Sequence, residues 1–192
     1  MSQQEILQPK HKLRSKMKEA FNTLSKDIVD TANTRITESC LLLAEINNAN
    51  TICIYLSLPD EVGTYSLFTE LRKKNKRVVV PKIYQSNLQL YEAESLKHLI
   101  NGSFGILEPS DTLPRVKAED VECFIVPGIA FDTKGHRLGR GMGYYDRLLE
   151  HISQPKIALA LDAQIVPMVP NESYDIVMDV IITETKIITI KH

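Results

Sequence analysis

The chain has 192 residues, a length that suits one domain with a hydrophobic core of its own. Its composition, 43% hydrophobic and 24% charged with a formal net charge of −1, argues against a general nucleic-acid binder and a polybasic membrane binder. The same balance leaves room for a local basic pocket that holds a small anion.

Two helices are expected first along the chain. Apolar residues recur at helical spacing within 5–24, and Pro9 indicates where that helix starts. Ser25 is typical of an N-cap, so a second helix is expected over 26–46.

Short apolar runs predict the strands of a sheet. A short helix with Leu67 and Leu71 on one face is expected between the first two strands, 51–58 and 77–83, and should end near Lys76. Pro81 places the end of the second strand at an edge or at the mouth of the sheet. The alternation of strands and helices is typical of an α/β fold with a largely parallel sheet covered on both faces. The predicted strands are 51–58, 77–83, 88–93, 122–127, 156–161 and 178–183, the last of them an inner strand.

The cysteines and the opening residues indicate the compartment. Cys40, Cys53 and Cys123 form no metal-ligating pattern and lie in apolar neighbourhoods, so buried reduced thiols are expected. The opening residues lack the apolar run of a secretory leader, and no run approaches the length of a membrane span. We therefore expect a cytoplasmic protein.

Half of the chain's eight glycines lie in the stretch 135–149, GHRLGRGMGYYDRLL. This stretch follows the predicted strand 122–127, and ligands of such sheets bind outside the carboxyl ends of the strands. Gly139, Gly141 and Gly143 alternate, so successive backbone N–H groups can point inward and form a nest for an anion. A helix is expected to follow the nest and to add free N–H groups of its own.

Charged side chains beside this nest indicate nucleotide chemistry. Arg137 and Arg140 can each grip a phosphate through a forked guanidinium, at about 1.5–3 kcal/mol per charge-assisted hydrogen bond. The carboxylate of Asp146 would repel a phosphate unless a cation lay between them, and Mg²⁺ is the natural cation. GxxxxGK[ST] is absent and Tyr144 stands where a Rossmann fingerprint needs a small residue, so neither motif applies. The alternative is a flexible surface loop followed by a packing helix.

The stretch 127–149, PGIAFDTKGHRLGRGMGYYDRLL, resembles the signature of the 5-formyltetrahydrofolate cyclo-ligase family, also called methenyltetrahydrofolate synthetase. That signature has a PGxxFD opening, a G-x-RLGxGxGYYD centre and a following helix. Further resemblances occur in the family's order at KHKLR (10–14), YLSLPDEVGT (55–64), FGILEP (104–109) and MDVIIT (178–183).

The resemblance implies a fold and a reaction. The fold is a single domain over 1–192, a three-layer α/β/α sandwich with a largely parallel central sheet, as in related isomerases and CoA-transferases. The reaction is the ATP- and Mg²⁺-dependent conversion of 5-formyltetrahydrofolate to 5,10-methenyltetrahydrofolate, with release of ADP and phosphate through a phosphorylated formyl (imidate) intermediate. The implied partners are these two small molecules, with no nucleic acid and no membrane, and we expect a monomer.

The resemblance also implies the site residues. Arg140 is expected to stabilise the transferring phosphoryl group and Tyr144 to face the folate, so these two are the expected catalytic residues. Glu61 is expected to anchor the pterin and Leu56 to form an apolar wall. The expected magnesium ligands are Asp146 and Asp179. The expected ATP contacts are Lys10, Arg14, Arg137, Leu138, Gly139, Arg140, Gly141, Met142, Gly143, Tyr144 and Tyr145. The expected folate contacts are Leu56, Glu61, Arg140, Gly141, Met142, Gly143 and Tyr144.

Without the resemblance, several of these residues have simpler interpretations. Lys10 and Arg14 lie four residues apart and fit the solvated basic face of a helix. Tyr145 fits core packing, Glu61 fits a solvated loop, and Asp179 fits a polar residue at the start of a strand.

Two other function classes stay open from the residues. A sugar-phosphate isomerase or CoA-transferase shares the fold class and would turn over without ATP. A non-catalytic folate-binding module would keep Glu61 and Leu56 and bind folate without Mg²⁺. Met142 and Gly63 depart from the family pattern, which often has Lys or Gly at the first position and Asp at the second. Without a lysine at position 142, we expect somewhat weaker ATP binding.

Overall fold

The computed structural model describes residues 3–102 and 107–191 of the chain, with side chains from Leu7 onward. The first half of the stretch 104–109, which carries part of the resemblance, lies outside the described residues.

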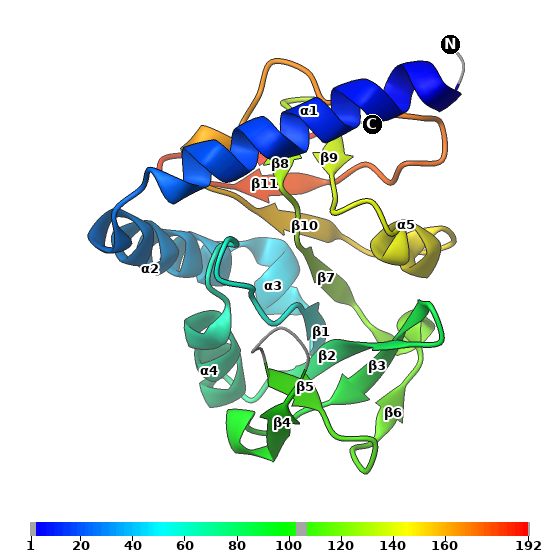
Figure 1. The fold of residues 1–192 in the computed structure, drawn as a ribbon. Helices are drawn as coiled ribbons and strands as arrows, with labels where there is room; N and C mark the ends of the chain where they lie inside the picture. Colours follow the sequence, from blue (N-terminus) through cyan, green and yellow to red (C-terminus); the bar gives the residue numbers. More distant parts are fainter. Residues whose placement is uncertain (1–2, 103–106, 192) are drawn as a thin grey trace.

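An eight-stranded sheet crosses the molecule (Figure 1). Its strands β11, β10, β7, β1 and β2 are parallel, while the neighbouring pairs at the two margins are antiparallel. In sheet order the strands are β12 (Ile187–Thr189), β11 (Val180–Ile182), β10 (Lys156–Leu159), β7 (Cys123–Val126), β1 (Thr51–Ile54), β2 (Arg77–Tyr84), β3 (Asn87–Glu92) and β6 (Arg115–Val116). A separate hairpin pairs β4 (Leu99–Asn101) with β5 (Leu107–Pro109).

Successive side chains of the parallel strands enter two different cores. In β7, Cys123 and Ile125 belong to one core, while Phe124 and Val126 belong to the other. Strands buried on both faces read as continuous apolar runs, which is why the sequence predicted them. The first core is covered by α2 (Lys26–Leu42), α3 (Ala44–Asn48) and α4 (Tyr65–Lys73), and the second by α5 (Tyr144–Leu149). The predicted α/β fold with a largely parallel, doubly covered sheet is confirmed.

Helix α1 (Gln3–Asn22) lies over a small hairpin (Figure 1). The hairpin pairs β8 (Ala130–Phe131) with β9 (Arg137–Leu138) and follows β7 directly along the chain. Met17 of α1 packs with Leu138 of the hairpin in a third small core. The hairpin was not predicted, and it positions both α1 and the glycine-rich stretch.

The first two predicted helices form with changed boundaries. Pro9 lies inside α1 instead of marking its start, so that prediction is wrong. Proline removes one helical hydrogen bond, but the later residues of α1 hold the helix by packing. Ser25 does cap α2, where its hydroxyl accepts the Ile28 N–H at 3.4 Å. The helix expected over 26–46 breaks at Leu43, whose ψ of 139° is extended, and continues as α3.

The remaining short elements complete the chain. Single 3₁₀ turns lie at Leu96–His98, Ala118–Asp120 and Asp162–Gln164.

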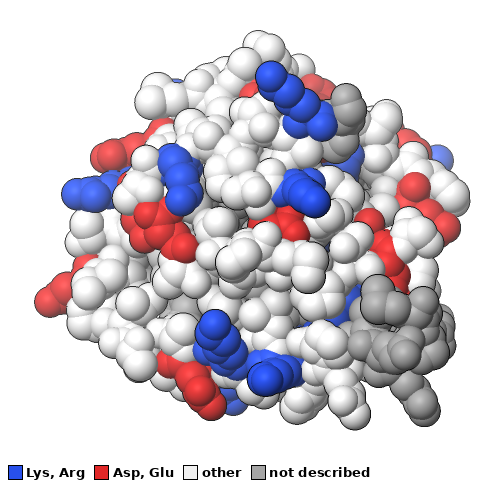
Figure 2. Space-filling model, turned by 90° about the horizontal axis from the view of Figure 1, so that it is seen from above, with Lys and Arg blue, Asp and Glu red and all other residues white. Residues whose placement is uncertain are grey.

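The cysteines and the surface agree with the composition. All three cysteines are buried and free, and burial raises the pKa of each thiol. The described residues contain no helix with the length and apolar character needed to cross a membrane. The face seen from above in Figure 2 carries Lys and Arg next to Asp and Glu, without an unbroken basic field.

Candidate active site

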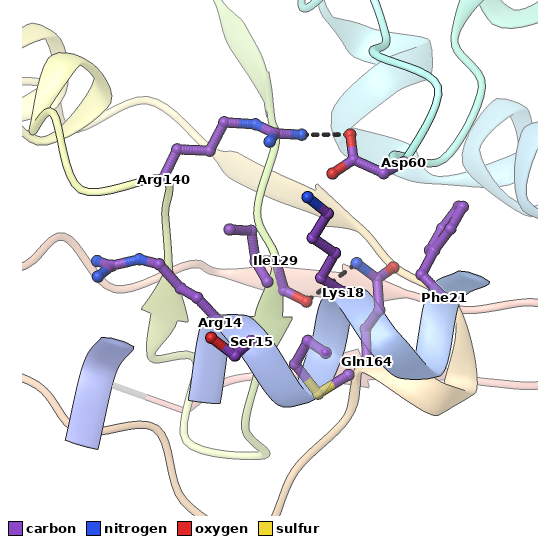
Figure 3. Close-up of a pocket in the computed structure, with 9 residues that line it drawn as sticks. Arg14, Ser15, Lys18, Phe21, Asp60, Ile129, Arg140 and Gln164 are labelled. Carbon is purple, nitrogen blue, oxygen red and sulfur yellow. Dashed lines mark hydrogen bonds and ion pairs between the residues drawn. The ribbon is translucent and has the colours of Figure 1, made fainter. Parts of the chain in front are cut away.

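A cavity of about 160 Å³ lies between segments that are far apart in the sequence (Figure 3). Helix α1 contributes Arg14 and Lys18, the loop after β1 contributes Asp60, and the glycine-rich stretch contributes Arg140. Gln164, from the segment after β10, completes the wall. The cavity therefore joins the glycine-rich stretch to the loop that carries the predicted pterin anchor.

Two of the three glycines of the nest have the special backbone conformation that the sequence predicted. Gly141 has a φ of +100° and Gly143 a φ of +64°, a region that side chains other than glycine's rarely adopt. Arg14 of α1 donates from Nε to the Gly139 carbonyl at 2.9 Å. Arg147 donates from Nη1 to the Met142 carbonyl at 3.0 Å. Two arginines thus hold the nest from outside.

The predicted helix after the nest is short. Helix α5 has six residues and starts directly after Gly143, which is its N-cap. An anion at this place would be held by the loop backbone and by arginine side chains more than by the helix dipole.

Arg140 connects the nest to the loop after β1. Its Nη2 donates to Asp60 Oδ1 at 2.6 Å and to Glu61 Oε1 at 3.2 Å, and its Nε donates to the same Glu61 oxygen at 3.2 Å. The second Glu61 oxygen accepts the Leu58 N–H at 3.0 Å. The Glu61 side chain is 8% exposed, and this burial raises its pKa, although the Leu58 N–H and Arg140 oppose the shift. Glu61 is a buried carboxylate aimed at the nest, so the solvated-loop interpretation does not apply.

Lys10 ties α1 to the segment between β10 and β11. Its Nζ lies 2.7 Å from Asp175 Oδ2 and 3.1 Å from Glu172 Oε2. Burial alone would lower the pKa of Lys10, but its hydrogen bonds to the two carboxylates outweigh burial and raise it. Lys10 and Arg14 therefore do not form a solvated basic face: one is paired with carboxylates and the other binds the nest.

The sequence of the chain matches a known protein family. A family model described as the 5-formyltetrahydrofolate cyclo-ligase family matches residues 6–184. The chain belongs to this family.

Individual relatives agree over nearly the whole chain. The chain is 29% identical to a probable 5-formyltetrahydrofolate cyclo-ligase of Schizosaccharomyces pombe, over 93% of this chain and 97% of that one. It is 30% identical to the Mus musculus 5-formyltetrahydrofolate cyclo-ligase, over 91% and 93%. The solved 5,10-methenyltetrahydrofolate synthetase of Aquifex aeolicus superposes with a TM-score of 0.86 at 33% identity, over 95% and 93%. These relationships support an enzyme with cyclo-ligase activity, ahead of the isomerase, CoA-transferase and binding-module alternatives.

Arg137 was expected to contact ATP, but in the structure its side chain binds Asp146. Its side chain is 5% exposed, donates from Nη2 to Asp146 Oδ1 at 2.7 Å and from Nη1 to the Pro127 carbonyl at 3.2 Å, and lies over the Tyr145 ring. Its Nε is buried without a hydrogen-bond partner among the described residues. Arg137 does not line the cavity of Figure 3. The geometry makes it a positioning residue for Asp146 and gives no support to a direct phosphate contact.

The two predicted magnesium ligands lie on different elements. Asp146 lies in the first turn of α5, directly after the nest. Asp179 precedes β11, where its Oδ2 accepts the Lys156 N–H at 2.7 Å and pairs with Lys156 Nζ at 3.1 Å. This is the amino end of β10 and β11, opposite the end at which the chain leaves β7 for the nest. Within the described ranges no group of three or more His, Cys, Asp and Glu residues could hold a metal ion. The pairing with Lys156 gives Asp179 a structural role at the start of β11, and its part in binding magnesium stays a prediction.

Other predicted contacts differ in exposure. Leu56 and Leu138 are buried, at 8% and 1% exposed, and the Leu138 carbonyl accepts the Ile129 N–H at 2.7 Å. Met142 is 61% exposed on the nest. Tyr144 lies under the Arg147 guanidinium, and burial raises the pKa of Tyr145 far above its ordinary value. Tyr145 packs against both cores, as its alternative interpretation proposed.

Several residues of the site were not predicted. Three carboxylates pair with its cations: Asp60 with Arg140, and Glu172 and Asp175 with Lys10. Of these three, only Asp60 could have been suspected from the sequence, because it is the neighbour of Glu61. Asp132, the last residue of the PGxxFD motif, holds the turn of the β8–β9 hairpin. Its Oδ1 accepts the Lys134 N–H at 2.9 Å, and its Oδ2 lies 2.9 Å from His136 Nδ1. The sequence signal for Asp132 was the motif itself.

Proposed function

We propose that the chain converts 5-formyltetrahydrofolate to 5,10-methenyltetrahydrofolate at this site, with ATP as co-substrate in the presence of Mg²⁺. The observation that carries the proposal is the Arg140 bridge. One guanidinium contacts the loop of Glu61, the proposed pterin anchor, and extends from the nest that we assign to the phosphates. A reaction that moves a phosphoryl group from ATP to a folate oxygen needs one cation at this junction.

The first step proposed is phosphoryl transfer. The formyl oxygen attacks the γ-phosphorus of ATP, the bond to the β-phosphate oxygen breaks, and ADP leaves. Arg140 lies where the transferring group carries its charge, and Arg14 and the nest backbone hold the phosphates that stay behind. No nucleophilic side chain is required, which fits a site built of cations and backbone.

The second step proposed is ring closure. The N10 amine attacks the activated formyl carbon, the N10 proton is lost, and the carbon–oxygen bond breaks to release phosphate. The Glu61 carboxylate accepts hydrogen bonds from the N–H groups of the pterin. Leu56 forms the apolar wall, and Tyr144 faces the folate from the end of the nest. Fixed orientation of N10 against the formyl carbon is the main contribution that the protein makes to this step.

Asp146 is the carboxylate that fits Mg²⁺. It lies beside the nest, it carries one hydrogen-bonded oxygen, and Arg137 fixes its orientation. Bound Mg²⁺ would neutralise phosphate charge. Asp179 is left out of this proposal because Lys156 holds its carboxylate at the other end of the strands.

The whole chain contributes to the proposed site. Contacts run from Lys10 on α1 to Asp175 before β11, so we propose that residues 1–192 act as one catalytic domain. We also propose a monomer, which light scattering at assay concentration would test.

An absorbance assay tests the function. The chain is mixed with 5-formyltetrahydrofolate and Mg²⁺, the near-ultraviolet band of the methenyl product is followed, and ATP is then added. A rise that starts with ATP and matches ADP release supports the proposal. No rise, with both ligands shown to bind, would refute it.

A further inference from the structure

Lys18 is a cation of the cavity wall with no assigned role. Lys10, Arg14 and Lys18 follow at four-residue spacing, so they lie along one face of α1. Lys10 is occupied by Glu172 and Asp175, and the Nε of Arg14 donates to the nest. Across the part of the chain that the structure describes, no hydrogen bond or ion pair to Lys18 is found. Lys18 is thus a cation of this face whose side chain remains available to a ligand.

The surroundings of Lys18 favour an anion. Its side chain points from α1 toward Asp60 and Arg140 across the cavity (Figure 3). Arg14, Lys18 and Arg140 bring three positive charges to the wall, and Asp60 brings the one carboxylate. A solvated lysine would be the ordinary interpretation of an exposed residue in a first helix, but this one faces a cavity with a net positive wall.

The position of the cavity identifies the anion. It lies between the nest, which we assign to the ATP phosphates, and the loop of Glu61, which we assign to the pterin. The formyl group is attached to the pterin, so the phosphoryl group in transfer must pass between these two places. Arg140, the proposed stabiliser of that group, faces Lys18 across the same cavity.

We infer that Lys18 binds the γ-phosphoryl group of ATP and keeps this contact while the group is transferred, as a second cation opposite Arg140. This inference rests on the proposed function. It predicts that Lys18 distinguishes ATP from ADP, because only ATP carries the group that Lys18 contacts.

The variants are Lys18→Met, Lys18→Arg and the control Lys16→Met. Lys16 is an exposed lysine of the same helix that does not line the cavity. Lys18→Met is expected to lower kcat roughly 10- to 100-fold, the range of a lost charge-assisted contact to a transferring group. It should weaken binding of a non-hydrolysable ATP analogue and leave ADP binding and 5-formyltetrahydrofolate binding unchanged. Lys18→Arg should keep most of the activity, and Lys16→Met should match the wild type.

The outcomes separate the inference from the proposed function. If the wild type forms no methenyl product with ATP, the proposed function fails and the inference fails with it. If wild type and Lys16→Met are active and Lys18→Met equals them, only the inference is refuted. It is also refuted if Lys18→Met changes only the KM for polyglutamylated folate, since Lys18 would then bind a folate carboxylate. The inference is refuted as well if Lys18→Met loses thermal stability with unchanged kcat, since Lys18 would then act only as a partner of Asp60.

Discussion

Replacing Arg140 with alanine tests the central contact of the proposed mechanism. A charge-assisted hydrogen bond to the phosphoryl group in transfer contributes about 1.5–3 kcal/mol. Wild-type Arg140 must first leave Asp60 and Glu61; solvent screens the pair with Asp60, whose side chain is 36% exposed, more than the pair with the buried Glu61. Breaking an ion pair that solvent screens costs about 0.2–1 kcal/mol, and we place the Glu61 pair at the upper end of this range, so the net loss in Arg140→Ala is about 1–2 kcal/mol, or roughly 5- to 30-fold in kcat.

The assay is the initial rate of methenyl formation, with ATP and 5-formyltetrahydrofolate varied separately. It should be run at mildly alkaline pH, because removal of Arg140 takes away one of the groups that lower the pKa of Glu61. Arg140→Lys should recover part of kcat, and Arg35→Ala, an exposed arginine on α2, serves as the matched control. If Arg140→Ala raises only a KM and leaves kcat intact, Arg140 does not stabilise the phosphoryl group in transfer.

Three further predictions concern the anchor, the metal and the nest. Burial raises the pKa of Glu61, so acidification should protonate it and weaken 5-formyltetrahydrofolate binding at a pH above the ordinary glutamate range. In equilibrium titrations, Glu61→Gln should weaken this binding at all pH values and abolish its pH dependence. Asp146→Asn should raise the Mg²⁺ concentration for half-maximal rate by roughly tenfold or more, and an unchanged magnesium titration would remove Asp146 from the metal shell. Gly141→Ala forces a side chain into a φ of +100°, so denaturant unfolding should show a loss of about 1–3 kcal/mol and ATP-analogue binding should fall, whereas an unperturbed variant would show that the nest does not need glycine there.

Features with a local cause were predictable from the sequence. The inner strands are buried on both faces, so each appears as an unbroken apolar run, and β1, β7 and β10 lie within their predicted ranges. Ser25 caps α2 because a hydroxyl before a helix satisfies a free N–H group. The positive φ angles of Gly141 and Gly143 follow the same rule, since the alternation of glycines already indicated a special backbone.

Features that depend on distant partners were not predictable. Lys10 meets Asp175 across 165 residues of sequence, and nothing near either residue indicates the other. The carboxylate of Asp179 was assigned to a metal through a motif, but its register beside Lys156 depends on how β10 and β11 align. The β8–β9 hairpin has strands of two residues each, too short for a periodic pattern, and its turn is fixed by Asp132.

The pairs around the cavity also link the two proposed substrates. Both oxygens of Glu61 already accept hydrogen bonds, one from Arg140 and the other from the Leu58 N–H. In the proposed mechanism, pterin N–H donors would therefore compete with Arg140 for the same carboxylate. If Arg140 moves to a phosphate, as the proposed mechanism requires, it releases Glu61, and nucleotide binding would then favour folate binding. Because such coupling is reciprocal, a folate on Glu61 favours the Arg140 position that binds phosphate. One guanidinium can thus make each substrate promote binding of the other without a larger conformational change.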